Sequence, residues 1–256
     1  MASIVYLAED LSLGRRVAVK VLRPAYSRDE IFRRRFLREW RTTAGLDHPH
    51  VMPVYGLGES NGILYAIMPY VHGGDLRALL DSNGPLALET AVSIVVRIGG
   101  ALDHLHARGL VHRDVKPANI LVDPRPDGHC YLCDFGIATG EVTASGTGAG
   151  PSGHFVGSLG YMAPEQIAAQ TVDRRSDVYA LGCVLYACLT AVAPFQEHEP
   201  SFGSAGRARN PPPAVLRPGL HPAVDRLVAK ATAADPRARH SSCGELTEEL
   251  RRILTP

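Results

Sequence analysis

Residues 110–121 read LVHRDVKPANIL, and this stretch is the most informative part of the chain. Its charged and amide side chains are too polar for a core strand. Apolar residues lie directly before and after these polar side chains, which is unusual for a surface loop. Asp114 and Lys116 lie two residues apart, and Asn119 lies five residues beyond Asp114. A carboxylate can accept a proton from an attacking hydroxyl, a lysine can neutralise a phosphate, and an asparagine oxygen can hold a hard metal ion. For this pattern alone, the alternative is a polar turn between two strands.

The composition bounds the class of protein. The 256 residues are 45% hydrophobic and 21% charged, which suits one large globular domain or two lobes that share a cleft. A net charge of +1 gives no field that would favour nucleic acid or a membrane surface as a partner. Five cysteines are an odd count and no secretory segment begins the chain, which predicts a reducing, cytoplasmic setting. Residues 178–193 carry no charge but fall short of the ~20 residues of a membrane span, so a buried core helix is expected there.

The beginning of the chain predicts a β-hairpin followed by a helix. Residues 3–8 and 17–22 are rich in β-forming residues and are separated by a polar turn. Ser27 precedes Glu30 by three residues, which is the spacing of a capping box. Because Gly45 is a natural stop, the helix is expected over 27–45.

Two charged residues in this part call for a partner. Lys20 interrupts the second strand between two valines, and Glu39 is the only acid on a helix face that also carries Phe32, Phe36 and Thr43. Burying that carboxylate alone would be costly, so an ion pair between Lys20 and Glu39 is expected. The alternatives are an exposed lysine in a strand and a glutamate at the rim of a helix.

The remaining segments predict a mainly helical second part. Residues 64–71 form a strand, and Pro69 within it argues against a central, fully bonded strand. A β-rich lobe over 1–70 should therefore meet a helical lobe over 71–256 at a boundary near 69–74. A hairpin is expected from 119–123 and 130–133, and helices over 88–108, 177–193, 222–233 and 242–254. Gly99 and Gly100 should each weaken the helix over 88–108 by about 1 kcal/mol, which predicts close packing at that point.

Four motifs follow one another along the chain: VAVK at 17–20, HRDVKPAN at 112–119, DFG at 134–136 and APE at 163–165. With them the chain resembles, from residue 3 to about 254, the eukaryotic-type (Hanks-type) serine/threonine protein kinases that bacteria also carry. The resemblance implies an α+β, bilobal protein-kinase fold, with a small antiparallel β lobe that holds one long helix and a larger helical lobe. It also identifies 110–121 as the catalytic loop and 134–165 as the activation segment.

The same resemblance implies ATP and Mg²⁺ as cofactors and gives roles to the charged residues. Asp114 would orient the substrate hydroxyl and accept its proton, and Lys116 would neutralise the transferring phosphoryl group. Lys20 would hold the α- and β-phosphates while paired with Glu39. The residues that would hold the metal ions are Asn119 and Asp134. A lysine two residues after the catalytic aspartate is similar to the serine/threonine-specific members.

The adenine site is implied in the same way. Val5, Ala18 and Leu121 resemble the apolar plates above and below the base, and Met68 stands at the gatekeeper position. Pro69 replaces the usual glutamate of the hinge, but its carbonyl is retained, and Val71 still has an N–H to donate.

Further residues resemble the structural and regulatory positions of the family. Asp177 resembles the helix carboxylate that anchors the catalytic loop, and Glu165 and Arg239 resemble the structural ion pair. Arg113 precedes the catalytic aspartate, as in members that are switched on by phosphorylation of the activation segment. The candidate acceptors are Ser152 first, then Thr147, Ser145 and Thr143, and Ser158 stands where the family usually has threonine.

One departure from the family affects the expected activity. No G-x-G-x-x-G precedes Val5, so the first strand and the lid over the phosphates are missing from this sequence. Either the start is trimmed or wrongly assigned, or the protein lacks a lid, which should weaken ATP binding and phosphate placement. The leading hypothesis is a serine/threonine kinase that acts on protein hydroxyls. The alternatives are a pseudokinase scaffold and a small-molecule phosphotransferase of related fold.

The expected partners follow from this hypothesis. They are a protein substrate with a serine or threonine acceptor and, as an open alternative, a second copy for trans-phosphorylation. Nucleic acid and a membrane segment are not expected. Cys130 and Cys133 form a C-x-x-C, but their spacing on a strand puts them on opposite faces, so no metal is expected there. Cys133 should face the back of the nucleotide pocket.

Overall fold

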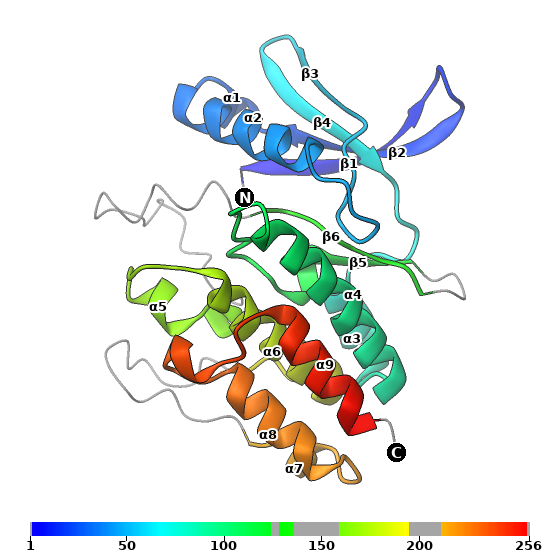
Figure 1. The fold of residues 1–256 in the computed structure, drawn as a ribbon. Coiled ribbons are helices and arrows are strands. Elements are labelled where there is room, and N and C mark those ends of the chain that lie inside the picture. The colour runs from blue at the N-terminus through cyan, green and yellow to red at the C-terminus, as the bar shows by residue number, and fades with distance from the viewer. Residues whose placement is uncertain (1, 124–127, 136–158, 195–210, 255–256) are drawn as a thin grey trace.

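The computed structural model describes residues 2–123, 128–135, 159–194 and 211–254. A curved antiparallel sheet and two helices form a small lobe, and a body of helices forms a larger lobe beside it (Figure 1). The expected α+β, two-lobed architecture is therefore confirmed. Residues 70–75 connect the last paired residue of the sheet to the first helix of the larger lobe.

The sheet of the small lobe has four strands in the order β1-β2-β4-β3. Their bounds are Ser3–Asp10 (β1), Arg15–Leu22 (β2), Gly56–Ser60 (β3) and Ile63–Pro69 (β4). The first hairpin is confirmed, and it is longer than the apolar runs suggested. β1 lies at the edge of the sheet, and in the described part of the chain only β2 pairs with it.

The expectation that Pro69 excludes a central, fully bonded strand was wrong. β4 is an interior strand that pairs with both β2 and β3, so its segment is bonded on two sides. Pro69 is tolerated because it is the last residue of the strand, where it lies opposite Val17 and a missing N–H costs little.

The prediction that Ser27 begins the long helix with a capping box was also wrong. A short helix, α1 (Pro24–Ser27), ends at Ser27, whose hydroxyl donates to the carbonyl of Leu22 at 3.0 Å. The long helix, α2 (Glu30–Ala44), begins three residues after Ser27, with Asp29 as its N-cap. The Asp29 carboxylate accepts from the N–H groups of Ile31 at 2.8 Å and Phe32 at 3.4 Å. An aspartate directly before the first turn is a strong N-cap, and it sets the helix start here.

The larger lobe packs around one buried helix. Its helices are α3 (Leu76–Asn83), α4 (Leu88–His106), α5 (Pro164–Ile167), α6 (Arg174–Thr190), α7 (Pro213–Leu216), α8 (Pro222–Ala231) and α9 (Cys243–Leu254). α6 is buried over nearly its whole length, as a helix that is apolar on all sides requires. Among the described helices, none combines the length and apolar character needed to cross a membrane.

The two glycines of α4 differ in their packing. A Cβ added at Gly99 would lie 2.8 Å from Cγ2 of Thr247 on α9, which is too close for a real contact. A Cβ at Gly100 would meet nothing nearer than 3.8 Å, and Gly100 is exposed. The expected close packing is therefore confirmed at Gly99 and absent at Gly100.

A two-stranded sheet lies between the two lobes. β5 (Ile120–Val122) and β6 (Cys130–Leu132) are antiparallel, as the hairpin prediction required. Ile120, Cys130 and Leu132 belong to the core of the helical lobe, whereas Leu121 and Tyr131 pack against the core of the β lobe. Two separate cores thus meet at one thin sheet.

Candidate active site

The catalytic loop is held by one buried carboxylate. Asp177, near the N-terminus of α6, accepts from the N–H of His112 at 2.8 Å and from the N–H of Arg113 at 2.9 Å. Arg113 has φ of 67°, a left-handed conformation that costs a non-glycine residue free energy and therefore needs such support. The anchoring contact that the resemblance implied for Asp177 is present.

His106 on α4 supports this anchor, and the sequence analysis missed it. Its Nε2 lies 2.7 Å from a carboxylate oxygen of Asp177. Burial opposes protonation of His106, but the hydrogen bonds and charges of Asp103 and Asp177 outweigh it and raise its pKa to about 9. The only signal in the sequence was an Asp and a His three residues apart on a helix, which is a common pattern.

Two polar side chains of the same loop contact Asp114. The ammonium of Lys116 lies 2.9 and 2.8 Å from the two carboxylate oxygens of Asp114. The amide nitrogen of Asn119 donates to the carbonyl of Asp114 at 2.7 Å and to its carboxylate at 2.9 Å. Because the nitrogen of Asn119 is used in this way, its side-chain oxygen is the atom that a cation would use.

Lys20 reaches across from the β lobe to this group. Its ammonium lies 2.6 Å from the carboxylate of Asp134, which follows β6 and has φ of 57°. Trp40 on α2 lies behind the pair, with its ring centre 5.7 Å from the Lys20 nitrogen. The analysis of the sequence did not single out Trp40, although it is the only tryptophan and follows Glu39 directly.

The expected ion pair between Lys20 and Glu39 is not formed. Among the described residues the ammonium of Lys20 is paired with Asp134, while Glu39 remains close enough for its charge to act on Lys20. Burial raises the pKa of Glu39 to about 7, which the Lys20 ammonium opposes and the Asp134 and Asp114 carboxylates reinforce. In this structure the half-exposed carboxylate of Asp134 holds the ammonium.

The residues expected to bind adenine lie partly together. In the sheet Val5 is opposite Lys20, and Ala18 is opposite Met68. Met68 and Val71 are buried in the β-lobe core, and Ala18, Leu121 and Cys133 pack against that core. Val5 remains 58% exposed on the edge strand and is outside this cluster. Pro69 is half-buried at the end of β4. Cys130 and Cys133 face different cores, as the strand geometry predicted.

His112 connects the catalytic loop to the segment that carries Asp134. It is fully buried, its Nε2 lies 3.2 Å from the carbonyl of Cys133, and its ring centre lies 5.0 Å from that of Phe135. Burial lowers its pKa, so the ring is neutral and acts as a packing element. Gln166, which the sequence analysis also missed, donates to the carbonyl of Arg113 at 2.9 Å.

A buried ion pair fixes the end of the activation segment. The two terminal nitrogens of the Arg239 guanidinium donate to the Glu165 carboxylate, at 2.7 and 2.8 Å, and both side chains are almost fully buried. This pair matches the expectation from the resemblance. The proposed phosphate acceptors, Ser152, Thr147, Ser145 and Thr143, lie outside the described residues, as does Ser158.

Comparison with known proteins gives consistent matches. Residues 1–248 match the family described as the protein kinase domain. The chain is 44% identical over 244 residues to the serine/threonine-protein kinase PknE of Mycobacterium tuberculosis, a match that covers 95% of this chain and 42% of that protein. It is 38% identical to the serine/threonine-protein kinase PrkC of Bacillus subtilis, over 96% of this chain and 38% of that protein. The chain therefore spans less than half the length of these curated relatives.

A solved structure agrees with these matches. The crystal structure of the PknI kinase domain of Mycobacterium tuberculosis is similar with a TM-score of 0.75 and 33% identity. The similarity covers 98% of this chain and 91% of that one.

Proposed function

Because this chain belongs to the protein kinase family and its relatives are named serine/threonine-protein kinases, we propose that it transfers the γ-phosphoryl group of ATP to serine and threonine hydroxyls of proteins. One observation carries the proposal. Lys20 from the β lobe and Asp134 from the helical lobe meet at 2.6 Å, beside a loop in which Asp114 is contacted by Lys116 and Asn119.

The roles follow from the charges and their positions. Asp114 is the only carboxylate of its loop and is partly exposed, so it is placed to orient a hydroxyl and take its proton. Lys116 is placed to neutralise charge on the phosphoryl group, and Lys20 on the phosphates further along the nucleotide. Asp177 and His106 act indirectly, because Asp177 holds the backbone of the loop and His106 holds Asp177.

The donor set at the base of the site fits Mg²⁺. A carboxylate from Asp134 and an amide oxygen from Asn119 are hard oxygen ligands of the kind that Mg²⁺ takes from proteins. The ammonium of Lys20 neutralises Asp134 in this structure. When bound, the metal would neutralise phosphate charge during transfer.

The decisive experiment is transfer of radiolabelled phosphate from ATP to a generic protein substrate. The wild-type chain should label the substrate on serine and threonine, and Asp114→Asn should lower the rate by at least about 10²-fold. A matched control is Asp81→Asn, since Asp81 is an exposed residue of α3 that pairs only with Arg77 in the described structure. Equal labelling by wild type and Asp114→Asn would remove Asp114 from this role. Nucleotide binding without any transfer by the wild type would favour the pseudokinase alternative.

The two alternatives have less support. The curated relatives are named as kinases, which gives no support to a pseudokinase. A small-molecule phosphotransferase is disfavoured by the same names, which specify protein kinases. We assign the domain to the cytoplasm, where ATP is available and cysteines stay reduced, in keeping with its five free cysteines. Phosphorylation within 139–158, in trans between two copies, remains our proposal for its regulation.

A further inference from the structure

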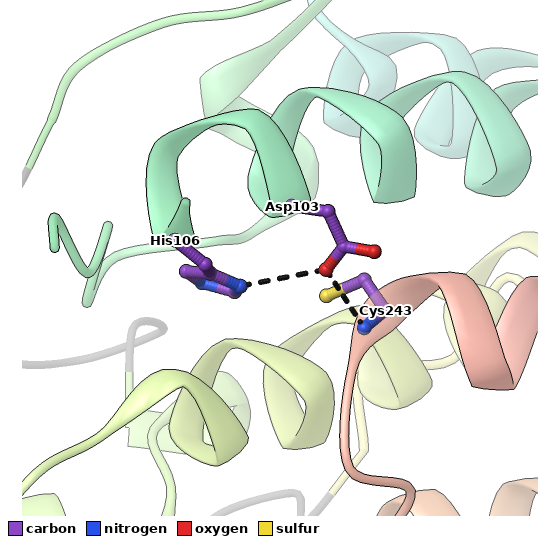
Figure 2. A group of neighbouring side chains, drawn as sticks. All are labelled: Asp103, His106 and Cys243. Carbon is purple, nitrogen blue, oxygen red and sulfur yellow. Dashed lines mark hydrogen bonds and ion pairs between the residues drawn. The ribbon is translucent and has the colours of Figure 1, made fainter. Parts of the chain in front are cut away.

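A second cluster of donor atoms lies away from the catalytic residues. Asp103 and His106 on α4 and Cys243 at the start of α9 bring a carboxylate oxygen, an imidazole nitrogen and a thiol sulfur within 4.8 Å of one another. Figure 2 shows the imidazole and the thiol next to the Asp103 carboxylate. We propose that these three side chains bind a Zn²⁺ ion that joins α4 to α9.

The chemistry of the donors fits Zn²⁺. The ion takes sulfur, nitrogen and carboxylate ligands in a tetrahedron, with bonds of about 2.0–2.3 Å, so neighbouring ligands lie about 3.3–3.7 Å apart. The present spacing would have to contract by about 1 Å, which rotation of three side chains can supply. Asp103 and His106 are three residues apart, so they share one face of α4. The side chain of Asp103 is 34% exposed and leaves a path from solvent.

The orientation of His106 is the second, independent observation. Its side chain is only 6% exposed, and its Nδ1 is buried without a hydrogen bond in the described structure. This nitrogen faces Asp103 and lies 3.5 Å from its carboxylate, at ion-pair distance. The opposite nitrogen, Nε2, is held by the Asp177 carboxylate at 2.7 Å. A carboxylate on the far nitrogen is the arrangement that orients metal-binding histidines.

Capping explains part of this cluster without a metal. The Asp103 carboxylate accepts from the N–H groups of Cys243 at 3.1 Å and Gly244 at 2.7 Å, at the N-terminus of α9. Each carboxylate oxygen keeps a second lone pair, so these bonds do not exclude a metal. Capping does not involve the Nδ1 of His106, which contacts only the Asp103 carboxylate among the described residues. Among the described residues this is the one group of three such side chains with metal-binding proximity.

The proposed ion would lie beside the support of the catalytic loop. His106 would contact the metal through Nδ1 and Asp177 through Nε2, and Asp177 holds His112 and Arg113. The site uses none of the residues proposed for phosphoryl transfer. The zinc site can therefore be tested independently of the proposed function.

The test is a Co²⁺ and Zn²⁺ titration of the purified chain after removal of metals with a chelator. Co²⁺ should give thiolate-to-metal absorption and the visible bands of a tetrahedral ion, and Zn²⁺ should displace it at one ion per chain. Cys243→Ser should abolish the thiolate band and weaken Zn²⁺ binding by at least about 10²-fold. Cys130→Ser, another fully buried cysteine outside the cluster, should leave both unchanged. Asp134→Asn should also keep the band, which separates this site from the magnesium site.

A measurement on the wild-type chain tests the site without depending on whether the variants fold. X-ray absorption of the zinc-loaded wild type should show one sulfur at about 2.3 Å and nitrogen or oxygen at about 2.0–2.2 Å. Loss of the signal in Asp103→Asn would support the proposal further. Failure to take up Zn²⁺, a zinc environment without sulfur, or equal binding by Cys243→Ser would overturn it.

Discussion

The ammonium of Lys20 lies 2.6 Å from the carboxylate of Asp134, a residue 114 positions away in the other lobe, and makes its ion pair there instead of with Glu39. The two groups proposed to receive the nucleotide phosphates and the metal thus neutralise each other in this structure. Binding of the nucleotide with its cation has to separate them, and the lost attraction between the two charges offsets part of the free energy gained on binding.

Replacing Lys20 tests its place in the site. Lys20→Met should lower phosphoryl transfer by at least about 10²-fold, because a positioned cation at the phosphates is lost. The measurement is the transfer rate over a range of ATP concentrations, together with the affinity for a fluorescent ATP analogue. Arg16→Met is a suitable control, since Arg16 is an exposed cation on the same strand. A Lys20→Met variant with the wild-type rate would contradict the assignment.

Glu39 should make stability depend on pH. Its pKa is about 7 in the folded chain against an ordinary 4.5, so the folded state holds this proton more tightly than the unfolded state. The resulting stabilisation is fully present below pH 4.5 and is lost as the pH rises through about 7. Between pH 5 and pH 8 the free energy of unfolding of the wild type should therefore fall, relative to that of Glu39→Gln, by about 1–3 kcal/mol. Urea denaturation of both proteins at the two pH values measures this, and a constant difference would count against it.

The neighbouring glycines of α4 should respond in opposite directions to alanine. Gly99→Ala should destabilise the fold by about 1 kcal/mol or more, because the new methyl group meets buried Thr247 at 2.8 Å and overpacking outweighs the gain in helix propensity. Gly100→Ala should stabilise it by about 0.5–1 kcal/mol, since the site is exposed and open. Thermal or urea unfolding of the two variants decides the matter, and the same sign for both would refute the packing argument.

The ion pair between Glu165 and Arg239 should be essential for stability. Glu165→Gln removes one charge and leaves the fully buried guanidinium unpaired, which should cost about 3–5 kcal/mol. The midpoint of urea unfolding reports this change. Arg237→Ala, two residues before Arg239 on the exposed surface, should change it by less than about 0.5 kcal/mol. Similar midpoints for both variants would show that the pair is dispensable.

Much of the fold follows from local patterns in the sequence. The hairpin of β1 and β2, the buried helix α6 and the closing helix α9 are all strongly patterned and were predicted within a few residues. The start of α2 was misplaced because two acceptable N-caps, Ser27 and Asp29, lie close together and only the structure shows which hydroxyl or carboxylate the backbone uses.

The site was predictable only where a motif defines its contacts. Asp114, Lys116 and Asn119 lie within six residues, so their spacing already places them together. The partner of Lys20 depends on how the two lobes are oriented, and no local pattern contains that information. The cluster of Asp103, His106 and Cys243 likewise depends on the packing of α4 against α9, two segments far apart in the chain.

The thin sheet of β5 and β6 also has a consequence for folding. Its alternate side chains are shared between two cores, with Cys130 and Leu132 on one side and Tyr131 and Cys133 on the other. A slip of one residue along either strand would send each of that strand's side chains into the wrong half of the molecule. Packing against both cores therefore fixes the register of these two short strands. A shift in that register would disturb the nucleotide site and the core of the helical lobe together.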